Sequence, residues 1–229
     1  MDLRRFFVVL LCFSLMILPA EAADGEKLVA LTFDDGPSGR FTRRLLEGLA
    51  QRDAKATFFL CGYRLEQYPK LARQIVEQGH EVGVHGYSHR SMCAMTPKEL
   101  ATEIQQTLAL LPADAIVFLR PPGGQCDRKT EKITQTYGLA ILHWSVDPQD
   151  WATDDTNRIV QRVVSQVQDG DVILLHDLSD SSVNAALRIV DALQKKGYRF
   201  VTASQLAKKQ GYLPSPGSSY TRFPKQDSK

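Results

Sequence analysis

Two adjacent carboxylates, Asp34 and Asp35, follow a short apolar stretch and are themselves followed by Gly36-Pro37. Two like charges at the end of a buried strand are unfavourable unless a cation lies nearby. Because neighbouring side chains of an extended strand point to opposite sides, one carboxylate can bind a metal while the other faces a substrate. The alternative is that one aspartate only caps the following helix or turn. The pair followed by Gly-Pro favours a functional site.

Two histidines four residues apart, His85 and His89, close another apolar stretch. This spacing lets both imidazoles face the same way across one helical turn or a tight loop, as in many metal sites. The pattern alone is weak, because two unrelated polar loop residues would look the same. Asp35 at an equivalent position supplies a third ligand. Two imidazoles and one carboxylate, with open positions for water, are typical of a hydrolytic metal site.

Three further polar clusters follow apolar stretches. Arg120 precedes two prolines, which restrict the backbone, and two glycines, which leave N–H groups open to a ligand. Trp151 is either a platform on which a sugar stacks or a core residue, and the sequence leaves both open. His176 stands where a strand should end, which makes it a candidate general acid or base.

The segments that carry these residues alternate between short apolar runs and helical patterns. The pattern predicts seven strands at residues 27–33, 56–60, 81–84, 115–119, 140–145, 171–175 and 198–201. It predicts helices at residues 38–52, 69–78, 96–110, 129–137, 156–168, 182–196 and 203–209. Such alternation indicates an α/β fold with a parallel sheet covered by helices. We favour a barrel because no break interrupts the units, with an open doubly wound sheet as the alternative.

A parallel barrel places its chemistry in the loops at the carboxyl ends of the strands. The clusters described above all fall at such ends. His80 precedes a predicted strand and His143 lies inside one. We therefore interpret both of these histidines as structural or solvated.

Composition sets the wider class. With 229 residues, 43% hydrophobic and 24% charged, the chain fits one globular domain. A net charge of +2 is too small to indicate nucleic-acid binding. Residues 213–229, rich in Pro, Ser and Lys, are expected to form a loose, flexible tail.

The first 23 residues have the pattern of a secretory signal peptide. Arg4 and Arg5 precede an apolar run at 6–18, and Ala20-Glu21-Ala22 supplies a small-residue cleavage site. The run has about 13 residues, whereas a bilayer span needs about 20. We therefore predict export and cleavage, with no stable membrane span afterwards, and an uncleaved anchor is the alternative.

The five clusters together resemble the polysaccharide deacetylase family, also called the NodB-homology family. The resemblance covers about residues 28–206 and suggests a domain at 24–212. It rests on five ordered motifs: T-F-D-D-G-P at 32–37, H-x-x-x-H at 85–89, R-P-P-G at 120–123, D-W at 150–151 and L-x-H at 174–176. It implies a single catalytic domain folded as a distorted (β/α)7 barrel.

The resemblance also implies a role for each motif residue. The residues expected to hold a divalent metal are Asp35, His85 and His89. The expected metal is Zn²⁺, with Co²⁺, Ni²⁺ or Mn²⁺ as alternatives. In catalysis, Asp34 is expected to act as the base and Arg120 to orient it. His176 is expected to act as the acid, and Asp150 to raise its pKa. Those expected to shape the substrate site are Gly123, Trp151 and Leu174.

The implied reaction is removal of N-acetyl groups from peptidoglycan, chitin-like oligomers or another N-acetylhexosamine polymer, by a monomeric enzyme. Water activated at the metal would attack the acetyl group. The alternatives are an O-acetyl esterase acting on xylan and a relative that binds carbohydrate without catalysis. The chain departs from the family pattern at Gly86, Arg90 and Gly123, which affects the loops more than the metal ligands.

The cysteines carry one inference beyond the family. Cys12 falls in the signal segment, which leaves Cys61, Cys93 and Cys126 in the mature chain. All three come just after predicted strands, on the expected catalytic face. We predict that two of them form a disulfide that braces the metal loop, with Cys93 and Cys126 as the pair.

Overall fold

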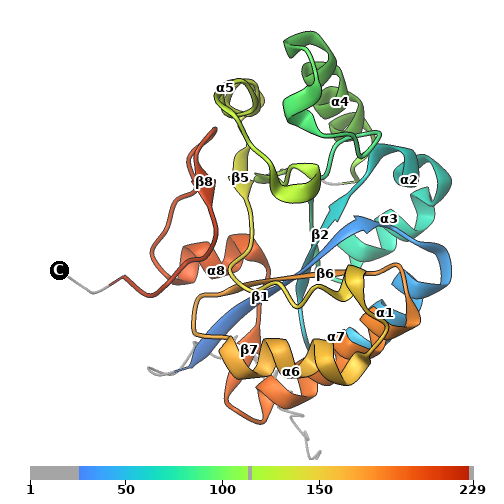
Figure 1. Cartoon of the computed structure of the whole chain (residues 1–229), viewed down its shortest axis with the longest axis vertical. Helices are drawn as coiled ribbons and strands as arrows, with labels where there is room; N and C mark the ends of the chain where they lie inside the picture. Colours follow the sequence, from blue (N-terminus) through green and yellow to red (C-terminus); the bar gives the residue numbers. More distant parts are fainter. Residues whose placement is uncertain (1–25, 113–114, 227–229) are drawn as a thin grey trace, which may run out of the picture.

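The computed structural model describes residues 26–112 and 115–226 (Figure 1). The predicted signal peptide at 1–23 lies outside these residues. No helix in the described part of the chain is both long enough and apolar enough to span a bilayer.

The strands form one parallel sheet built around β1 (Lys27–Gly36). The others are β2 (Ala56–Leu60), β3 (Glu81–Val84), β4 (Phe118–Leu119), β5 (Ala140–Leu142), β6 (Val172–His176), β7 (Tyr198–Phe200) and β8 (Ser219–Tyr220). Their order is β6-β1-β2-β3-β4-β5-β8, and β7 pairs with the first residues of β1. This is the succession of a ring of strands, without the reversal that defines a doubly wound sheet.

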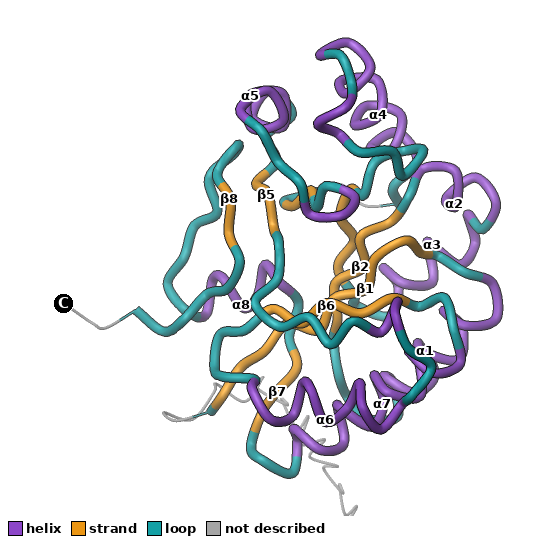
Figure 2. The backbone as a smooth tube through the Cα atoms, viewed as in Figure 1, coloured by secondary structure: helices purple, strands orange, loops and turns teal. Residues whose placement is uncertain are grey.

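The ring is distorted where β5 should meet β6. The segment after β5, rather than β5 itself, meets β6, through an isolated bridge between Val146 and Ile173, and β8 pairs with β5. Figure 2 shows β5 and β8 side by side at the margin of the molecule, away from the central strands. The predicted α/β fold with a distorted barrel is confirmed.

Helices cover the outside of the sheet (Figures 1 and 2). They are α1 (Gly39–Ala50), α2 (Gly62–Gln67), α3 (Pro69–Glu77), α4 (Pro97–Leu110), α5 (Arg128–Thr136), α6 (Thr156–Gln166), α7 (Asp180–Gln194) and α8 (Ala203–Lys209). Short 3-10 turns occur at Met92–Ala94, Pro122–Gly124 and Asp150–Ala152. α4 begins with a capping box, in which the side chains of Thr96 and Glu99 each accept from the other residue's backbone N–H.

The core explains why the strands end where they do. All five residues of β2 are buried, as expected for a strand covered on both faces, and the ring of Phe58 stacks on Phe33 at 5.2 Å. On α1, the apolar residues at helical spacing, Leu45, Leu46 and Leu49, are fully buried. The barrel is therefore fixed by packing on both faces of its strands, and the polar residues are left at the strand ends.

The segment after residue 212 is packed rather than loose, which corrects the expectation of a flexible tail for residues 213–226. β8 pairs with β5, and Phe223 is fully buried between the rings of Tyr212, Tyr220 and Phe118. The backbone N–H of Phe223 donates to the Gly170 carbonyl at 2.8 Å. The burial of Phe223 thus holds this segment against the barrel, although its composition is typical of a loop. Residues 227–229 lie outside the described part.

The predicted disulfide is wrong in this structure, because Cys61, Cys93 and Cys126 are all free thiols. Cys61 is completely buried, and burial raises its pKa far above the ordinary range. The Cys126 sulfur contacts the Asp127 carbonyl at 3.8 Å, and burial raises the pKa of its thiol to about 11. Both thiols are therefore protonated, and unreactive as nucleophiles, at neutral pH.

Candidate active site

Asp34 and Asp35 are separated by a break in the geometry of β1. The register between β1 and β2 shifts between Asp34 and Gly36, and Asp35 has a left-handed backbone with φ of 71°. Such a bulge changes the direction of a side chain at the end of a strand. Gly36 is needed here, because a Cβ atom on it would lie 2.7 Å from a carboxylate oxygen of buried Asp177. The tight turn delivers both carboxylates to the carboxyl end of the sheet.

Asp35, His85 and His89 converge on one point. Their ligand atoms all lie within 4.8 Å of one another. The Asp35 Oδ1 atom is 3.1 Å from His85 Nε2 and 2.9 Å from His89 Nε2. His89 reaches this point through a left-handed backbone, with φ of 59°. The loop after β3 thus brings the second histidine back over the first.

The hydrogen bonds show that a cation fits between these three groups. His85 Nδ1 lies 2.8 Å from the Arg120 carbonyl oxygen, which can only accept, so Nδ1 carries the proton. A ring protonated at Nδ1 alone presents the lone pair of Nε2 to a carboxylate oxygen 3.1 Å away, which is also an acceptor. That oxygen, Asp35 Oδ1, is buried and has no hydrogen-bond donor in the described structure. A divalent metal bound by all three groups would satisfy both acceptors.

Asp34 is held by a fully buried arginine. The Arg120 Nη1 atom donates to Asp34 Oδ1 at 2.7 Å and to Thr32 Oγ1 at 2.8 Å. Its other nitrogens donate to the carbonyl oxygens of Leu142 and His143 at 2.8 and 2.7 Å. The planar guanidinium, fixed at all three nitrogens, leaves Asp34 little freedom to rotate. The second oxygen of Asp34 is 3.8 Å from His85 Nε2 and therefore faces the three metal-site residues.

His176 forms a tight pair with Asp150. The side-chain Nδ1 of His176 lies 2.9 Å from Asp150 Oδ1, and its backbone N–H donates to Oδ2 at 2.8 Å. Burial alone would lower the pKa of His176. The hydrogen bond to Asp150 and the charges of Asp150, Asp34 and Asp35 outweigh burial and raise that pKa to about 9. His176 is thus a cation at neutral pH, with Nε2–H as the proton that remains available.

These groups share one open cleft of about 420 Å³. It is lined by Asp34, Asp35, His85, His89, Gly123, Trp144, Asp147, Trp151, Leu174 and His176. Eight of the ten residues predicted for the site are in this lining, and Arg120 and Asp150 lie directly behind it. Trp151 is 66% exposed, which excludes the core-packing interpretation. Gly123 has φ of 67° and no atom within 4 Å of where a side chain would begin, so its backbone is open to a ligand.

The comparison with protein families agrees with this geometry. The family model described as Polysaccharide deacetylase matches residues 21–142, more than half of the chain. The chain belongs to the polysaccharide deacetylase family. Its curated relatives are named as deacetylases that act on the amide bond of N-acetylated sugars, and the protein is a carbohydrate deacetylase.

Curated relatives cover most of this deacetylase. A peptidoglycan-N-acetylglucosamine deacetylase of Bacillus cereus is 36% identical over 194 residues, 81% of this chain and 91% of that protein. A chitooligosaccharide deacetylase of Sinorhizobium fredii is 33% identical over 191 residues, 76% of this chain and 89% of that protein. A peptidoglycan-N-acetylmuramic acid deacetylase of Bacillus subtilis is 35% identical over 184 residues, which are 79% of this chain but 39% of that longer protein.

Solved structures show the same fold. One described as T48 deacetylase with substrate has a TM-score of 0.80 at 33% identity, covering 85% of this chain and 96% of the other. A family 4 acetyl xylan esterase from Clostridium thermocellum, in complex with a cobalt ion, has a TM-score of 0.80 at 31% identity, covering 86% of this chain and all of the other.

The remaining histidines of the deacetylase lie outside the cleft lining. His80 is buried, its Nδ1 accepts from the Ala56 N–H at 3.2 Å, and burial followed by the Lys55 charge lowers its pKa to about 4. His143 contributes its backbone carbonyl to Arg120. Both are structural, as predicted. Trp144 and Asp147 also line the cleft, and the sequence does not predict them because neither belongs to a recognisable motif.

Proposed function

We propose that this protein is a metal-dependent hydrolase that removes N-acetyl groups from N-acetylhexosamine residues of a polysaccharide, with peptidoglycan as the substrate. One observation carries the proposal. A rigid Asp34–Arg120 pair and a cationic His176–Asp150 pair face one cleft that also holds three convergent metal-ligand side chains. Amide hydrolysis needs a base for the attacking water, an acid for the leaving nitrogen and an electrophile for the carbonyl oxygen, and this arrangement supplies all three.

Asp35, His85 and His89 would hold the metal. Two imidazole nitrogens and one carboxylate suit Zn²⁺, and the cobalt ion in the similar esterase structure supports a divalent cation of this size. When bound, such an ion lowers the pKa of a water molecule towards about 7 and polarises a carbonyl group.

Asp34 and His176 would move the protons. Asp34, oriented by Arg120, accepts a proton from the attacking water, whose oxygen bonds to the acetyl carbon. His176 donates its Nε2 proton to the sugar nitrogen as the C–N bond breaks, so acetate and a free amine leave. Gly123, without a side chain, leaves space and an N–H group beside the developing oxyanion. Exposed Trp151 and buried Leu174 form the walls that position the acetyl group.

The pH profile should depend on Asp150. Because the pKa of His176 is raised to about 9, kcat should fall as the pH rises through that value and the acid loses its proton. Asp150→Asn removes the charge that holds this proton, so the alkaline limb should move to lower pH by about one unit. The stability of the fold should change with pH in the same direction. Protonated His176 contributes stability that is fully present below pH 6.5 and is lost as the pH rises through about 9. A kcat profile from pH 6 to 11 that is identical for both proteins would contradict the assignment.

Acetate release from three substrates tests the function. Wild-type protein should release acetate from peptidoglycan glycan strands and from N-acetylglucosamine oligomers, and much more slowly from acetylated xylan. The relatives named above support the amide substrates, whereas the similar xylan esterase supports the ester as the second candidate. A preference for xylan would make the protein an esterase, and glycan binding without any acetate release would make it an inactive relative.

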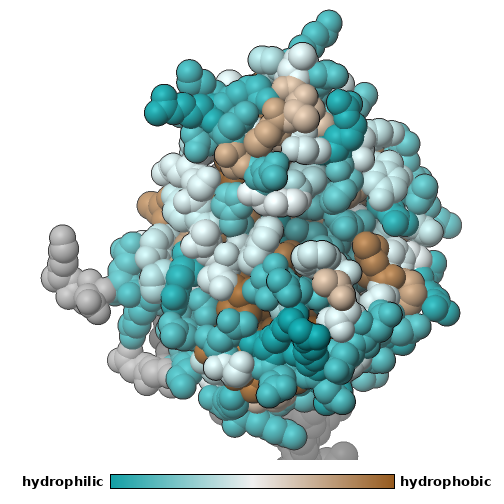
Figure 3. Space-filling view, in the orientation of Figure 1, coloured by the Kyte–Doolittle hydropathy of each residue, from teal (hydrophilic) through white to brown (hydrophobic). Residues whose placement is uncertain are grey.

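The setting follows from the substrate. We propose that residues 1–23 are a signal peptide and that the domain at 24–212, with its packed C-terminal segment, acts outside the cytoplasm where the cell wall lies. The face shown in Figure 3 is mainly hydrophilic, with hydrophobic residues in small separate patches. A surface of this kind supports a monomer.

A further inference from the structure

A second cavity of about 300 Å³ opens beside the catalytic cleft. Its walls include Arg40, Phe41, Arg64, Tyr68 and Leu178. They come from the start of α1, from α2 and its junction with α3, and from the loop after β6. Asp35 and His176 lie at the carboxyl ends of β1 and β6, and the cavity residues Ser38 and Leu178 follow these ends directly, so the cavity lies on the same face of the barrel as the cleft.

Residues that line the cavity are close in sequence to residues that line the cleft. Ser38 in the cavity is three residues from Asp35, and Leu178 is two residues from His176. Since consecutive Cα atoms are 3.8 Å apart, the Cα atoms of Asp35 and Ser38 are at most about 11 Å apart. That is the span of one or two hexose units. A glycan chain with one sugar in the cleft can therefore present a substituent of a nearby sugar to the cavity.

The cavity carries excess positive charge. Arg40 and Arg44 share one carboxylate, Asp180, at 3.3 and 2.6 Å. Arg64 has no carboxylate within 4.0 Å among the described residues. The side-chain hydrogen bond recorded for Arg64 runs from Nε to the Tyr63 hydroxyl at 3.1 Å, which leaves the two terminal nitrogens available. The part of the cavity lining that the structure describes thus holds two guanidinium groups, those of Arg40 and Arg64, and no carboxylate.

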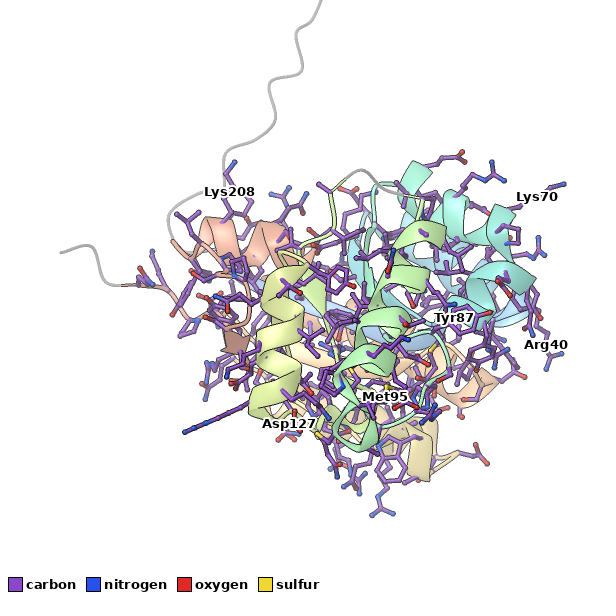
Figure 4. The ribbon with its side chains drawn as sticks, turned by 90° about the horizontal axis from the view of Figure 1, so that it is seen from above. Arg40, Lys70, Tyr87, Met95, Asp127 and Lys208 are labelled. Carbon is purple, nitrogen blue, oxygen red and sulfur yellow. The ribbon has the colours of Figure 1, made fainter. Side chains whose placement is uncertain are left out.

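The neighbouring surface extends this charge. An adjoining hollow of about 320 Å³ shares Tyr68 and adds Arg43 and Lys70. Figure 4 shows Arg40 and Lys70 extending outward on the same side of the molecule. The half-buried Arg64 side chain beside the aromatic wall of Tyr68 is the best-placed cation, because partial exclusion of water strengthens its attraction for an anion.

We propose that this cavity is a subsite for a carboxylate carried by the glycan next to the sugar that loses its acetyl group. The planar fork of arginine matches a carboxylate, with two parallel hydrogen bonds. The inference rests on the proposed function and narrows it, because uncharged chitin-like oligomers have no group to place here. In peptidoglycan the carboxylate is either that of the lactyl ether on the sugar or one of the attached peptide, and both have the same chemistry.

Arg64→Gln on three substrates tests the subsite. The substrates are an N-acetylglucosamine oligomer, glycan strands with free lactyl carboxylates, and strands that keep their peptides. A charged hydrogen bond of this kind is worth about a factor of ten. We expect kcat/KM to fall about tenfold on a carboxylate-bearing strand, through KM, and less than twofold on the neutral oligomer. Added salt should weaken wild-type binding of the charged strand more than that of the variant.

Arg188→Gln is the matched control, since this exposed arginine lies in the second half of α7 and the substitution removes the same charge. It should leave all three substrates unchanged. In peptide-bearing strands the lactyl carboxyl group is consumed in the amide bond to the peptide, so each strand carries a different carboxylate. A loss with Arg64→Gln on peptide-bearing strands alone would assign the carboxylate to the peptide, and a loss on peptide-free strands alone would assign it to the lactyl group. A loss on both strands would mean that the subsite accepts either carboxylate. Equal effects on neutral and charged substrates, or none, would overturn the subsite. If wild-type protein releases no acetate from any substrate, the proposed function fails instead.

Discussion

Asp34→Asn should lower kcat for acetate release by about three orders of magnitude, within the range that a general base contributes. The amide has the shape of the carboxylate but cannot accept the proton of the attacking water. Its oxygen can still accept from Arg120, whose other hydrogen bonds go to Thr32, Leu142 and His143 and do not depend on the charge. The loss should therefore appear in kcat, measured by acetate release at saturating substrate. The melting temperature should fall as well, because fully buried Arg120 loses the carboxylate charge that pairs with it.

Two measurements keep this result specific. Metal content should equal that of the wild type, because the proposed ligands are Asp35, His85 and His89 and do not include Asp34. Asp154→Asn, the same chemical change at an exposed carboxylate outside the cleft lining, should retain full kcat. An Asp34→Asn protein that releases acetate at the wild-type rate would exclude Asp34 as the base.

The meeting of the five motifs could be predicted from the sequence because their positions follow from topology. Parallel strands joined by helices place all their carboxyl ends at one edge, so residues that end β1, β3 and β6 must meet wherever the strands pair. Periodicity located those strands to within a few residues. Hence Asp35, His85 and His176 could be placed on one face without any knowledge of side-chain contacts.

The hydrogen bonds behind the cleft could not be predicted in this way. Arg120 looks like a surface residue in a turn, yet it is fully buried because four acceptors, two of them carbonyl groups at the end of β5, replace its water. The left-handed backbone of Asp35 is equally hidden, since the strand pattern predicts simple alternation. Both features depend on tertiary partners that lie far away in sequence.

In the C-terminal segment, the amino-acid composition concealed a contact with the barrel. Residues rich in proline and serine usually stay unpacked because they bury little apolar surface. Here Tyr212, Tyr220 and Phe223 supply that surface, and the ring of Phe223 lies next to that of Phe118 in β4. Composition averages such residues away, whereas the spacing of the aromatics in this segment was a signal that could have been used.

Removing the metal should abolish activity and leave the barrel folded. Treatment of the protein with a chelator should lower acetate release by at least about two orders of magnitude, because the residues that remain cannot lower the pKa of water towards neutrality. Activity should return on addition of Zn²⁺ or Co²⁺. The fold should persist because the core formed by α1, β1 and β2 does not involve the ligands. Circular dichroism and metal analysis of the same sample check both parts.

His89→Ala identifies the site without disturbing the core. The His89 side chain is 42% exposed, whereas that of His85 is 2% exposed, so truncation of His89 removes a ligand and little packing. The wild type should melt at a higher temperature when Zn²⁺ is added, since an ion that binds only the folded state stabilises it. His89→Ala should lose this shift together with its activity, while His143→Gln, which changes a histidine outside the cleft lining, should keep both. If His89→Ala kept its metal, the ion would have to lie elsewhere. A proton between Asp35 Oδ1 and His85 Nε2, rather than a metal ion, would then have to relieve the repulsion between their lone pairs.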